Sequence, residues 1–370
     1  MMQIFKAYKY RIYPTENQEV LLNKTFGCCR VVWNVCTEAF NSPVGQKVEF
    51  PKSYTEIKKK FDWMSEVSAT ALQNAFNNFF EFKKQFFSKT RKKKVGRPKF
   101  KSKVGKQSYS LHSQKFSLGN NFIRLEKIGR VKVVIAGHRP PKDCDFRSVT
   151  VSKDVTGKFF VSVLVKELKP KSLPVTDSVV GIDVGIKTFA VLSDGTEISN
   201  PKFFSESQAE LRKAQKSLSR KKKGSTRRKK ARLKVALIHE KIRNQRKHFH
   251  HEVSRMIVNS YSVIGLEDLT ISGMVQNRKL SKAISDAGWS QFVSFLSYKA
   301  EWAGRTVQKI GKFFPSSKLC SNCGVIKKDL TLADRSWVCD CGVRISRDLN
   351  AAVNIKNEAI RLLAQEVACA

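Results

Sequence analysis

The chain has 370 residues, with 70 Lys and Arg against 31 Asp and Glu, so its formal net charge is +39. At about 100–200 residues per domain, this length suggests two or three domains. The hydrophobic fraction of 41% excludes a disordered basic tail. Such a charge calls for a polyanionic partner, and nucleic acid fits better than a membrane surface. No apolar run approaches the roughly 20 residues of a membrane-spanning helix.

The cysteines and the first residues indicate the compartment. The nine cysteines are odd in number and scattered, which makes a poor disulfide framework. Residues 1–14 contain no continuous apolar run of the kind found in signal peptides. We therefore expect a reducing, intracellular environment.

The first half of the chain begins with a strand and two helices. Residues 4–13 alternate in polarity and predict a strand, which Pro14 ends. Thr15 and Gln18 match a capping box, and apolar residues then recur at helical spacing. Cys28, Cys29 and Cys36 fall on this apolar face, which favours core packing over metal ligation or redox chemistry. A second helix is expected over residues 68–87, with an aromatic stripe that is typical of a core. Support of a nucleic-acid duplex by these flat rings is the alternative.

Residues 107–167 have the pattern of strands, and Pro170 and Pro174 mark a linker. The first strand and this region are expected to form one domain, with the helices of residues 15–105 inserted. In the second half of the chain, the sequence pattern predicts a hairpin and a third strand over residues 178–199 and a helical region over 205–258, with a break at 224–225. It then predicts a strand over 261–266, a helix over 289–304 and a final helix from Asp348.

Three carboxylates lie at predicted strand or helix ends. Asp183 and Glu267 each stand in or after an apolar strand, and Asp348 begins the final helix. A charged group in such a setting is costly unless it is compensated. Carboxylate oxygens suit Mg²⁺ or Mn²⁺, and three that converge could hold two ions about 4 Å apart for phosphodiester hydrolysis.

Each carboxylate also has a purely structural interpretation. Asp183 could cap a buried turn beside Gly185, Glu267 could form a salt bridge at a strand end, and Asp348 could be a helix N-cap. Asp268 is excluded, because strand alternation places it on the opposite face from Glu267. The order of elements along the chain is what strengthens the metal interpretation.

The late cysteines form two pairs, Cys320 with Cys323 and Cys339 with Cys341, each followed by glycine. Four thiolates are typical of a closed structural Zn²⁺ site, which leaves no open position for catalysis. A redox dithiol or a knuckle that has lost its metal are the alternatives, because the second pair has only one intervening residue.

Basic residues cluster in two segments: a loop after the second helix, and a run whose helical frame continues through Leu237, Ile238 and Ile242. The second run therefore belongs to a folded element, and together the two favour a phosphate track over a solvated helix face or a nuclear-localisation signal. The candidate nucleic-acid contacts are Arg91, Lys92, Lys93, Lys94, Arg220, Lys221, Lys222, Arg227, Arg228, Lys229 and Lys230. His248, His250 and His251 suggest a polar helix face rather than a metal site, since no matching ligand lies nearby in the sequence.

Several motifs resemble the TnpB family, transposon-encoded RNA-guided nucleases related to type V CRISPR effectors. The resemblance covers nearly the whole chain. Its pieces are YRIYPT at 10–15, FGCCR at 26–30, GIDVGIK at 181–187, GLEDL at 265–269, ISDAGW at 284–289, FPSSKLCSNCG at 314–324 and RDLNAA at 347–352. The second cysteine pair departs from the C-x-x-C of many relatives.

The resemblance implies a multidomain α/β and α+β protein. A β-barrel wedge domain over 1–14 and 106–172 would carry a helical recognition insertion over 15–105. A RuvC-like nuclease domain of RNase H type over 176–318 and 342–370 would hold a zinc-binding target-nucleic-acid module over 319–341. The family's catalytic Asp, Glu and Asp fall on Asp183, Glu267 and Asp348.

The resemblance also implies the activity and the partners. We expect a Mg²⁺-dependent RNA-guided DNA endonuclease that binds a guide RNA from the transposon end and a target with a short flanking motif. We expect one monomer per guide RNA, no membrane, and a cytoplasmic, nucleoid-associated location in a prokaryote. A catalytically silent RNA-guided repressor and a transposase proper are the alternatives.

Overall fold

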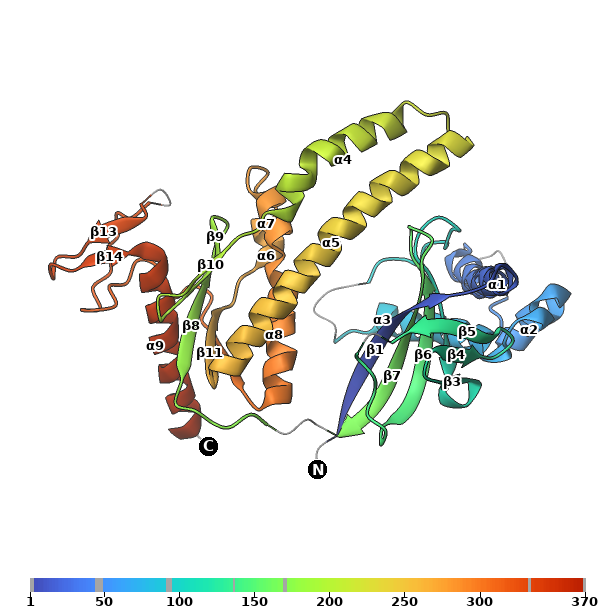
Figure 1. Ribbon diagram of the computed structural model, residues 1–370, viewed down its shortest axis with the longest axis horizontal. Coiled ribbons are helices and arrows are strands. Elements are labelled where there is room, and N and C mark those ends of the chain that lie inside the picture. Colours follow the sequence, from blue (N-terminus) through green and yellow to red (C-terminus); the bar gives the residue numbers. More distant parts are fainter. Residues whose placement is uncertain are drawn as a thin grey trace. The chain divides into compact units, whose positions relative to one another are not determined.

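The computed structural model describes residues 3–43, 49–90, 95–135, 137–168, 172–331 and 334–368. The chain divides into two compact units, Met1–Lys169 and Pro170–Ala370, and each has its own sheet and core (Figure 1). Within the described residues, no helix is both long enough and apolar enough to cross a bilayer.

The first unit is built on a seven-stranded sheet in the order β2-β6-β7-β1-β5-β4-β3. Its strands are β1 (Gln3–Tyr13), β2 (Gln107–His112), β3 (Phe116–Leu118), β4 (Phe122–Leu125), β5 (Gly129–Val134), β6 (Asp145–Lys153) and β7 (Phe159–Leu168). β1 pairs antiparallel with both β5 and β7, so it lies inside the sheet formed by residues 107–168. The edge strands β2 and β3 are joined by the short turn η2 (Ser113–Lys115), so the sheet curls into a nearly closed barrel.

Helices α1 (Glu16–Asn41), α2 (Tyr54–Lys60) and α3 (Ala69–Phe87), with η1 (Asp62–Glu66), lie between β1 and β2 in the chain. The capping box at the start of α1 is confirmed, since the Thr15 amide donates to Gln18 Oε1 at 3.1 Å and the Gln18 amide donates to Thr15 Oγ1 at 3.4 Å. The aromatic stripe of α3 belongs to the core, where Phe79 is fully buried and contacts Trp33 edge-on.

The second unit contains a five-stranded sheet in the order β10-β9-β8-β11-β12. Its strands are β8 (Val179–Val184), β9 (Thr188–Leu192), β10 (Glu197–Ser199), β11 (Val263–Glu267) and β12 (Thr306–Ile310). β8, β11 and β12 run parallel, whereas β9 is antiparallel to β8 and to β10. The sequence pattern predicted every strand but β12, a short edge strand that alternates only weakly.

Helices cover both faces of this sheet, and their bounds are α4 (Phe203–Ser219), α5 (Thr226–Ser260), α6 (Ile271–Met274), α7 (Ser281–Ala287), α8 (Trp289–Ala303) and α9 (Arg347–Ala368). α5 and α8 share a core with one face, which includes Ile257 and Phe292. α9 lies on the other face, where Ile355 and Ala359 pack with Ile310 of β12 (Figure 1). α4 and α5 form a long hairpin.

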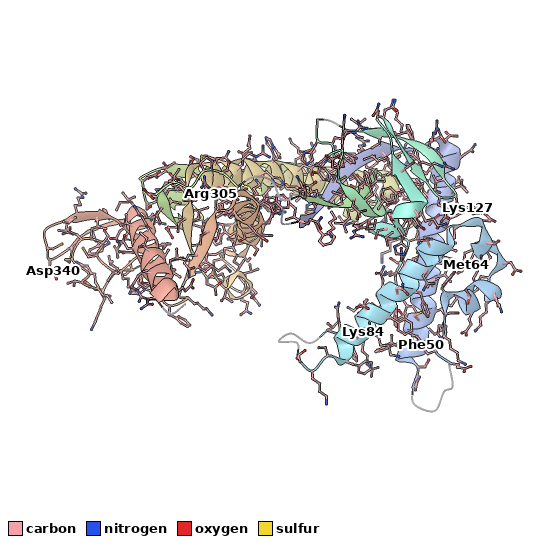
Figure 2. All side chains as sticks on the ribbon, turned by 90° about the horizontal axis from the view of Figure 1, so that it is seen from below. Phe50, Met64, Lys84, Lys127, Arg305 and Asp340 are labelled. Atoms are coloured by element: carbon pink, nitrogen blue, oxygen red, sulfur yellow. The ribbon has the colours of Figure 1, made fainter. Side chains whose placement is uncertain are left out.

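A small module stands between β12 and α9. It contains the antiparallel pair β13 (Ser336–Val338) and β14 (Arg344–Ser346), and its core combines Trp337 and Ile345 with two cysteines. Figure 2 shows Asp340 at the outer tip of this module, whereas Arg305 lies within the body of the unit.

Candidate active site and metal centre

A pair of glycines lets α9 lie directly on β8 and β11. Gly181 and Gly265 are register partners in this parallel strand pair. A Cβ atom at Gly181 would lie only 2.1 Å from the carbonyl oxygen of Ala352, and one at Gly265 would lie 3.0 Å from that of Ile355. The helix backbone therefore occupies the space that side chains would take at these two positions.

This packing explains why three carboxylates distant in the sequence come together. Side chains two residues apart point to the same face of a strand, so Asp183 and Glu267, each two residues after a glycine, point to the α9 face. Residues four apart share one face of a helix, so Asp348 lies on the face of Ala352. The three predicted residues therefore meet at the carboxyl ends of β8 and β11.

The pKa of Asp183 reflects the nearby charges of the other two carboxylates. Burial, reinforced by the charges of Glu267 and Asp348, raises the pKa of Asp183 well above its usual range. The guanidinium groups of Arg347 and Arg335 offset part of this effect. A half-buried carboxyl group with two like-charged neighbours is a favourable place for a cation.

The other two carboxylates have partners that the sequence pattern did not predict. Glu267 Oε1 accepts a 2.6 Å hydrogen bond from Ser316 Oγ, and Asp348 Oδ1 lies 3.6 Å from Arg335 Nη1. Asp268 is exposed and pairs with Lys309 at 3.2 Å, so it stays outside the site, as strand alternation predicted.

The four late cysteines converge on one point. Their sulfur atoms all lie within 4.8 Å of one another, with 3.8 Å between Cys320 and Cys341 and 3.5 Å between Cys323 and Cys339. Sulfurs bound tetrahedrally at about 2.3 Å from an ion are about 3.8 Å apart. The shorter Cys-x-Cys pair therefore reaches the cluster, and this donor set fits a metal ion.

The turn after each cysteine pair depends on glycine. Gly324 has a φ of +77° and Gly342 a φ of +84°, and each amide donates back to the first cysteine of its pair. In the described part of the chain, no other group of three or more His, Cys, Asp or Glu side chains brings its ligand atoms so close together. The carboxylate site is therefore wider than the thiol site.

The two basic segments differ in what can be described. Arg91, Lys92, Lys93 and Lys94 lie outside the described residues. At the α4–α5 turn, most predicted contacts are exposed, but Arg228 is half-buried and donates to the carbonyls of Leu218 and Lys221 at 3.1 and 2.7 Å. The Arg228 guanidinium therefore stabilises the turn between α4 and α5. The exposed members are Arg220, Lys222, Arg227, Lys229 and Lys230.

The prediction of a polar helix face at the histidines is wrong for His250. This side chain is buried, with Nε2 2.9 Å from the Ala287 carbonyl oxygen and Nδ1 3.2 Å from Gln291 Oε1. Burial lowers the pKa of His250, which favours the neutral form of the ring. His248 is exposed and lies 3.3 Å from Glu252.

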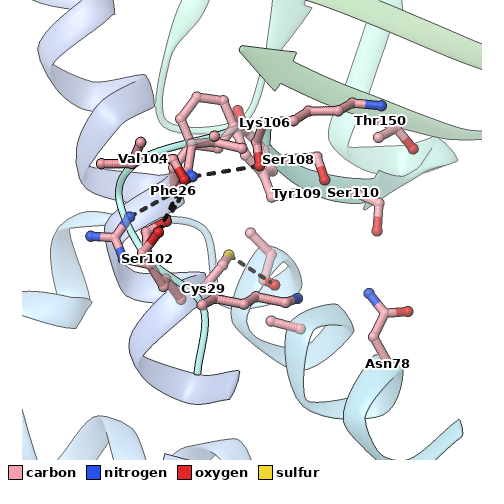
Figure 3. Close-up of a pocket in the computed structure, with 16 residues that line it drawn as sticks. Phe26, Cys29, Asn78, Ser102, Val104, Lys106, Ser108, Tyr109, Ser110 and Thr150 are labelled. Carbon is pink, nitrogen blue, oxygen red and sulfur yellow. Dashed lines mark hydrogen bonds between the residues drawn. The ribbon is translucent and has the colours of Figure 1, made fainter. Parts of the chain in front are cut away.

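A polar cavity of about 490 Å³ lies in the first unit between α1, α3 and β2 (Figure 3). Lys101, Asn78 and Ser108 contribute to its lining. The hydroxyl of Tyr109, which also lines it, is buried without a hydrogen-bond partner in the described residues. Burial lowers the pKa of Lys101. No sequence motif pointed to this cavity.

Fold and side chains together define a protein with a carboxylate centre suited to divalent cations and a separate four-thiol site. Three sequence families match parts of the chain. Residues 161–278 match a family described as “Probable transposase” (OrfB_IS605), and residues 289–355 match “Cas12f1-like, TNB domain”. Residues 1–36 match a family described as “Helix-turn-helix domain”, although here they form β1 and most of α1.

Relatives match along most of the chain. A Streptomyces pristinaespiralis protein named “Putative RNA-guided DNA endonuclease” is 40% identical, over 96% of this chain and 89% of its own length. The Escherichia coli protein “Putative RNA-guided DNA endonuclease InsQ” is 27% identical over 96% and 92%. The chain therefore belongs to the TnpB family of RNA-guided DNA endonucleases. A solved structure titled “Cryo-EM structure of the Cas12f1-sgRNA-target DNA complex” aligns with 96% of this chain and 99% of its own, at 14% identity and a TM-score of 0.38.

Proposed function

We propose that this protein is a transposon-encoded RNA-guided DNA endonuclease with a single nuclease site at Asp183, Glu267 and Asp348. The observation that carries the proposal is the placement of these carboxylates beside α9, where burial and the charges of Glu267 and Asp348 raise the pKa of Asp183. The name of the 40% identical relative, “Putative RNA-guided DNA endonuclease”, indicates the activity that this site would perform.

The sheet supports a RuvC-like nuclease fold of RNase H type. Its first three strands form an antiparallel meander, and two further strands add in parallel beside the first. We assign residues 176–318 and 342–370 to this domain and 319–341 to the cysteine module. The pairing of β1 with β5 and β7 supports a barrel of residues 1–14 and 106–172 with the helices of 15–105 inserted.

The carboxylate site fits Mg²⁺ or Mn²⁺, because Asp183, Glu267 and Asp348 offer carboxylate oxygens, the ligands that these hard cations prefer. When bound, two such ions would activate water and stabilise the leaving oxygen of a phosphodiester. The residues themselves supply charge and position. Asp183 is held within β8, Ser316 fixes one oxygen of Glu267, and Arg335 stands beside Asp348.

The cysteine module fits one structural Zn²⁺. Cys341→Ser should release the ion and destabilise the module, because a structural zinc site contributes directly to folding. Cys144→Ser, at a half-buried cysteine of the first unit, is the matched control and should retain zinc. Metal analysis of the purified proteins checks this, and a wild-type protein without zinc would contradict the assignment.

The partners are a guide RNA and a target DNA with a short flanking motif. Base pairing between them would supply the sequence, while the protein holds backbone and shape. The exposed basic residues at the α4–α5 turn suit phosphate contacts, since Lys and Arg neutralise phosphates without reading sequence. We expect one protein chain per guide RNA.

Two alternative functions, a silent repressor and a transposase, would have different effects on target DNA. A silent RNA-guided repressor would bind its target without cutting, yet all three carboxylates are present here, and the charges of Glu267 and Asp348 act on Asp183. A transposase, which the description of the family matching residues 161–278 suggests, would join DNA strands rather than release cut ends.

The test begins with sequencing the RNA that co-purifies with the protein. That RNA, a matching DNA and Mg²⁺ should then give guide-dependent cleavage. Asp183→Ala should abolish cutting and preserve RNA and target binding, whereas Asp268→Ala, at the exposed neighbour of Glu267, should cut as the wild type does. Cutting by Asp183→Ala at the wild-type rate would refute the site, and joined strands would favour the transposase.

A further inference from the structure

The loop between β12 and the cysteine module contacts the proposed nuclease site through Ser316. Ser316, in this loop, is only 5% exposed, and its hydroxyl donates to Glu267 Oε1 at 2.6 Å. A carboxylate can only accept hydrogen bonds, so the single hydroxyl proton of Ser316 points at Glu267. This charge-assisted bond fixes one oxygen of Glu267 and leaves Oε2 for another ligand.

The backbone of Ser316 is itself held by two buried asparagines of α9. Asn354 Nδ2 lies 2.8 Å from the Ser316 carbonyl oxygen and 2.6 Å from that of Leu319. Asn350, one helical turn earlier, donates to the same two carbonyls at 3.4 and 2.7 Å. Both side chains are at most 3% exposed, and buried amides of this kind are costly unless they are paired. The loop is therefore bound to α9 on both sides of its turn.

The same clamp reaches the first cysteine pair. Asn350 Oδ1 accepts a 2.9 Å hydrogen bond from the amide of Ser321, which follows Cys320. Asn350 also lies two residues after Asp348 on α9. α9 therefore carries Asp348 itself and holds Glu267 through Ser316. The same helix, through Asn350, also fixes the backbone next to Cys320.

We propose that Ser316 is a positioning residue for Glu267, held in place by Asn350 and Asn354, so that α9 aligns two of the three carboxylates of the nuclease site. This inference rests on the proposed function, because Glu267 needs alignment only if it binds a cation. Polar groups that orient metal-binding carboxylates change metal affinity or activity by about 10–100-fold when removed. A serine that merely fills the loop would change stability alone.

The test compares four single variants of the full-length protein. Ser316→Ala should raise the Mg²⁺ concentration for half-maximal guided cleavage about tenfold or more. Its zinc content and target binding should remain those of the wild type. Asn354→Leu should shift the Mg²⁺ dependence in the same direction. The controls Ser317→Ala and Asn357→Leu, at a neighbouring serine and an exposed asparagine of α9, should leave it unchanged.

A double variant tests whether the two residues act through one path. If Asn354 acts through Ser316, combining Ser316→Ala with Asn354→Leu should cost no more than the larger single effect. Fully additive shifts, or an unchanged Mg²⁺ dependence in Ser316→Ala, would overturn the proposal.

A binding measurement separates this inference from the proposed function. Mn²⁺ titration of the RNA-free protein, followed by electron paramagnetic resonance, should show weaker binding for Ser316→Ala and loss of that site in Asp183→Ala. If the wild type fails to cleave guided DNA, the proposed function fails and the Mn²⁺ titration still decides the role of Ser316. The positioning role of Ser316 is overturned if Ser316→Ala and the wild type bind Mn²⁺ with equal affinity. It is also overturned if Mn²⁺ binding does not differ between the wild type and Asp183→Ala.

Discussion

Asp183 combines burial with two like-charged neighbours, and this arrangement costs stability when no cation is bound. Its pKa is raised in the folded protein, whereas the unfolded chain releases that proton near the ordinary value of about 4. Between these two values the folded state binds more protons than the unfolded state. Stability therefore falls as pH rises through this window, and bound Mg²⁺ should offset the loss.

Removing the charge of Asp183 should consequently stabilise the protein while it inactivates the site. In buffer without Mg²⁺ at neutral pH, Asp183→Asn should raise the free energy of unfolding by about 1 kcal/mol and flatten its decline with pH. Denaturant unfolding across the pH range measures both effects, with Asp268→Asn as the control. A less stable Asp183→Asn protein would show that the carboxylate contributes hydrogen bonds that outweigh its repulsion.

At the scale of elements, the sequence pattern predicted most of the strands and long helices, because their periodicity is local. It also singled out the carboxylates and cysteines, whose residue types carry chemistry at recognisable spacing. It missed β12, the Ser316 contact and the asparagine clamp. These depend on parallel pairing between distant strands and on where α9 lies, and a Ser or Asn in a loop or helix has no periodicity that reveals its partner. His250 was misplaced for the same reason, since its core partners come from α7 and α8.

The seating of α9 on the Gly181–Gly265 pair makes its own prediction. In Gly181→Ala the new methyl group would meet the α9 backbone, 2.1 Å from Ala352 O and 2.4 Å from Lys356 N. Backbone atoms cannot rotate away as a side chain can, so α9 must shift and carry Asp348 with it. We expect a loss of about 1–3 kcal/mol in stability together with strongly reduced cleavage.

Thermal unfolding and the guided cleavage assay measure these two effects of Gly181→Ala. Gly311→Ala is the matched control, because a Cβ there meets no atom within 4 Å and the backbone needs no positive φ. Wild-type cleavage by Gly181→Ala would mean that the position of α9 does not determine the site.

At the scale of the whole molecule, the net charge of +39 dominates any encounter with RNA or DNA. Each phosphate contact releases counterions, so affinity should fall steeply with salt. The basic residues do not all have the same role, however. Arg228 donates hydrogen bonds to backbone carbonyls of the α4–α5 turn. Its exposed basic neighbours are Arg220, Lys222, Arg227 and Lys229.

This contrast separates phosphate contacts from structural arginines. Changing Arg220, Lys222, Arg227 and Lys229 together to Gln should lower the slope of log affinity against log salt for guide RNA by up to about 3, because each single-strand contact contributes about 0.7. Arg228→Gln should leave that slope nearly unchanged and lower the melting temperature instead, because the hairpin turn loses its guanidinium bonds. Binding measured between about 50 and 200 mM salt gives the slopes. Equal slopes for the quadruple variant and wild type would place the RNA contacts elsewhere, and the same substitutions at Arg91, Lys92, Lys93 and Lys94 would then identify the other predicted segment.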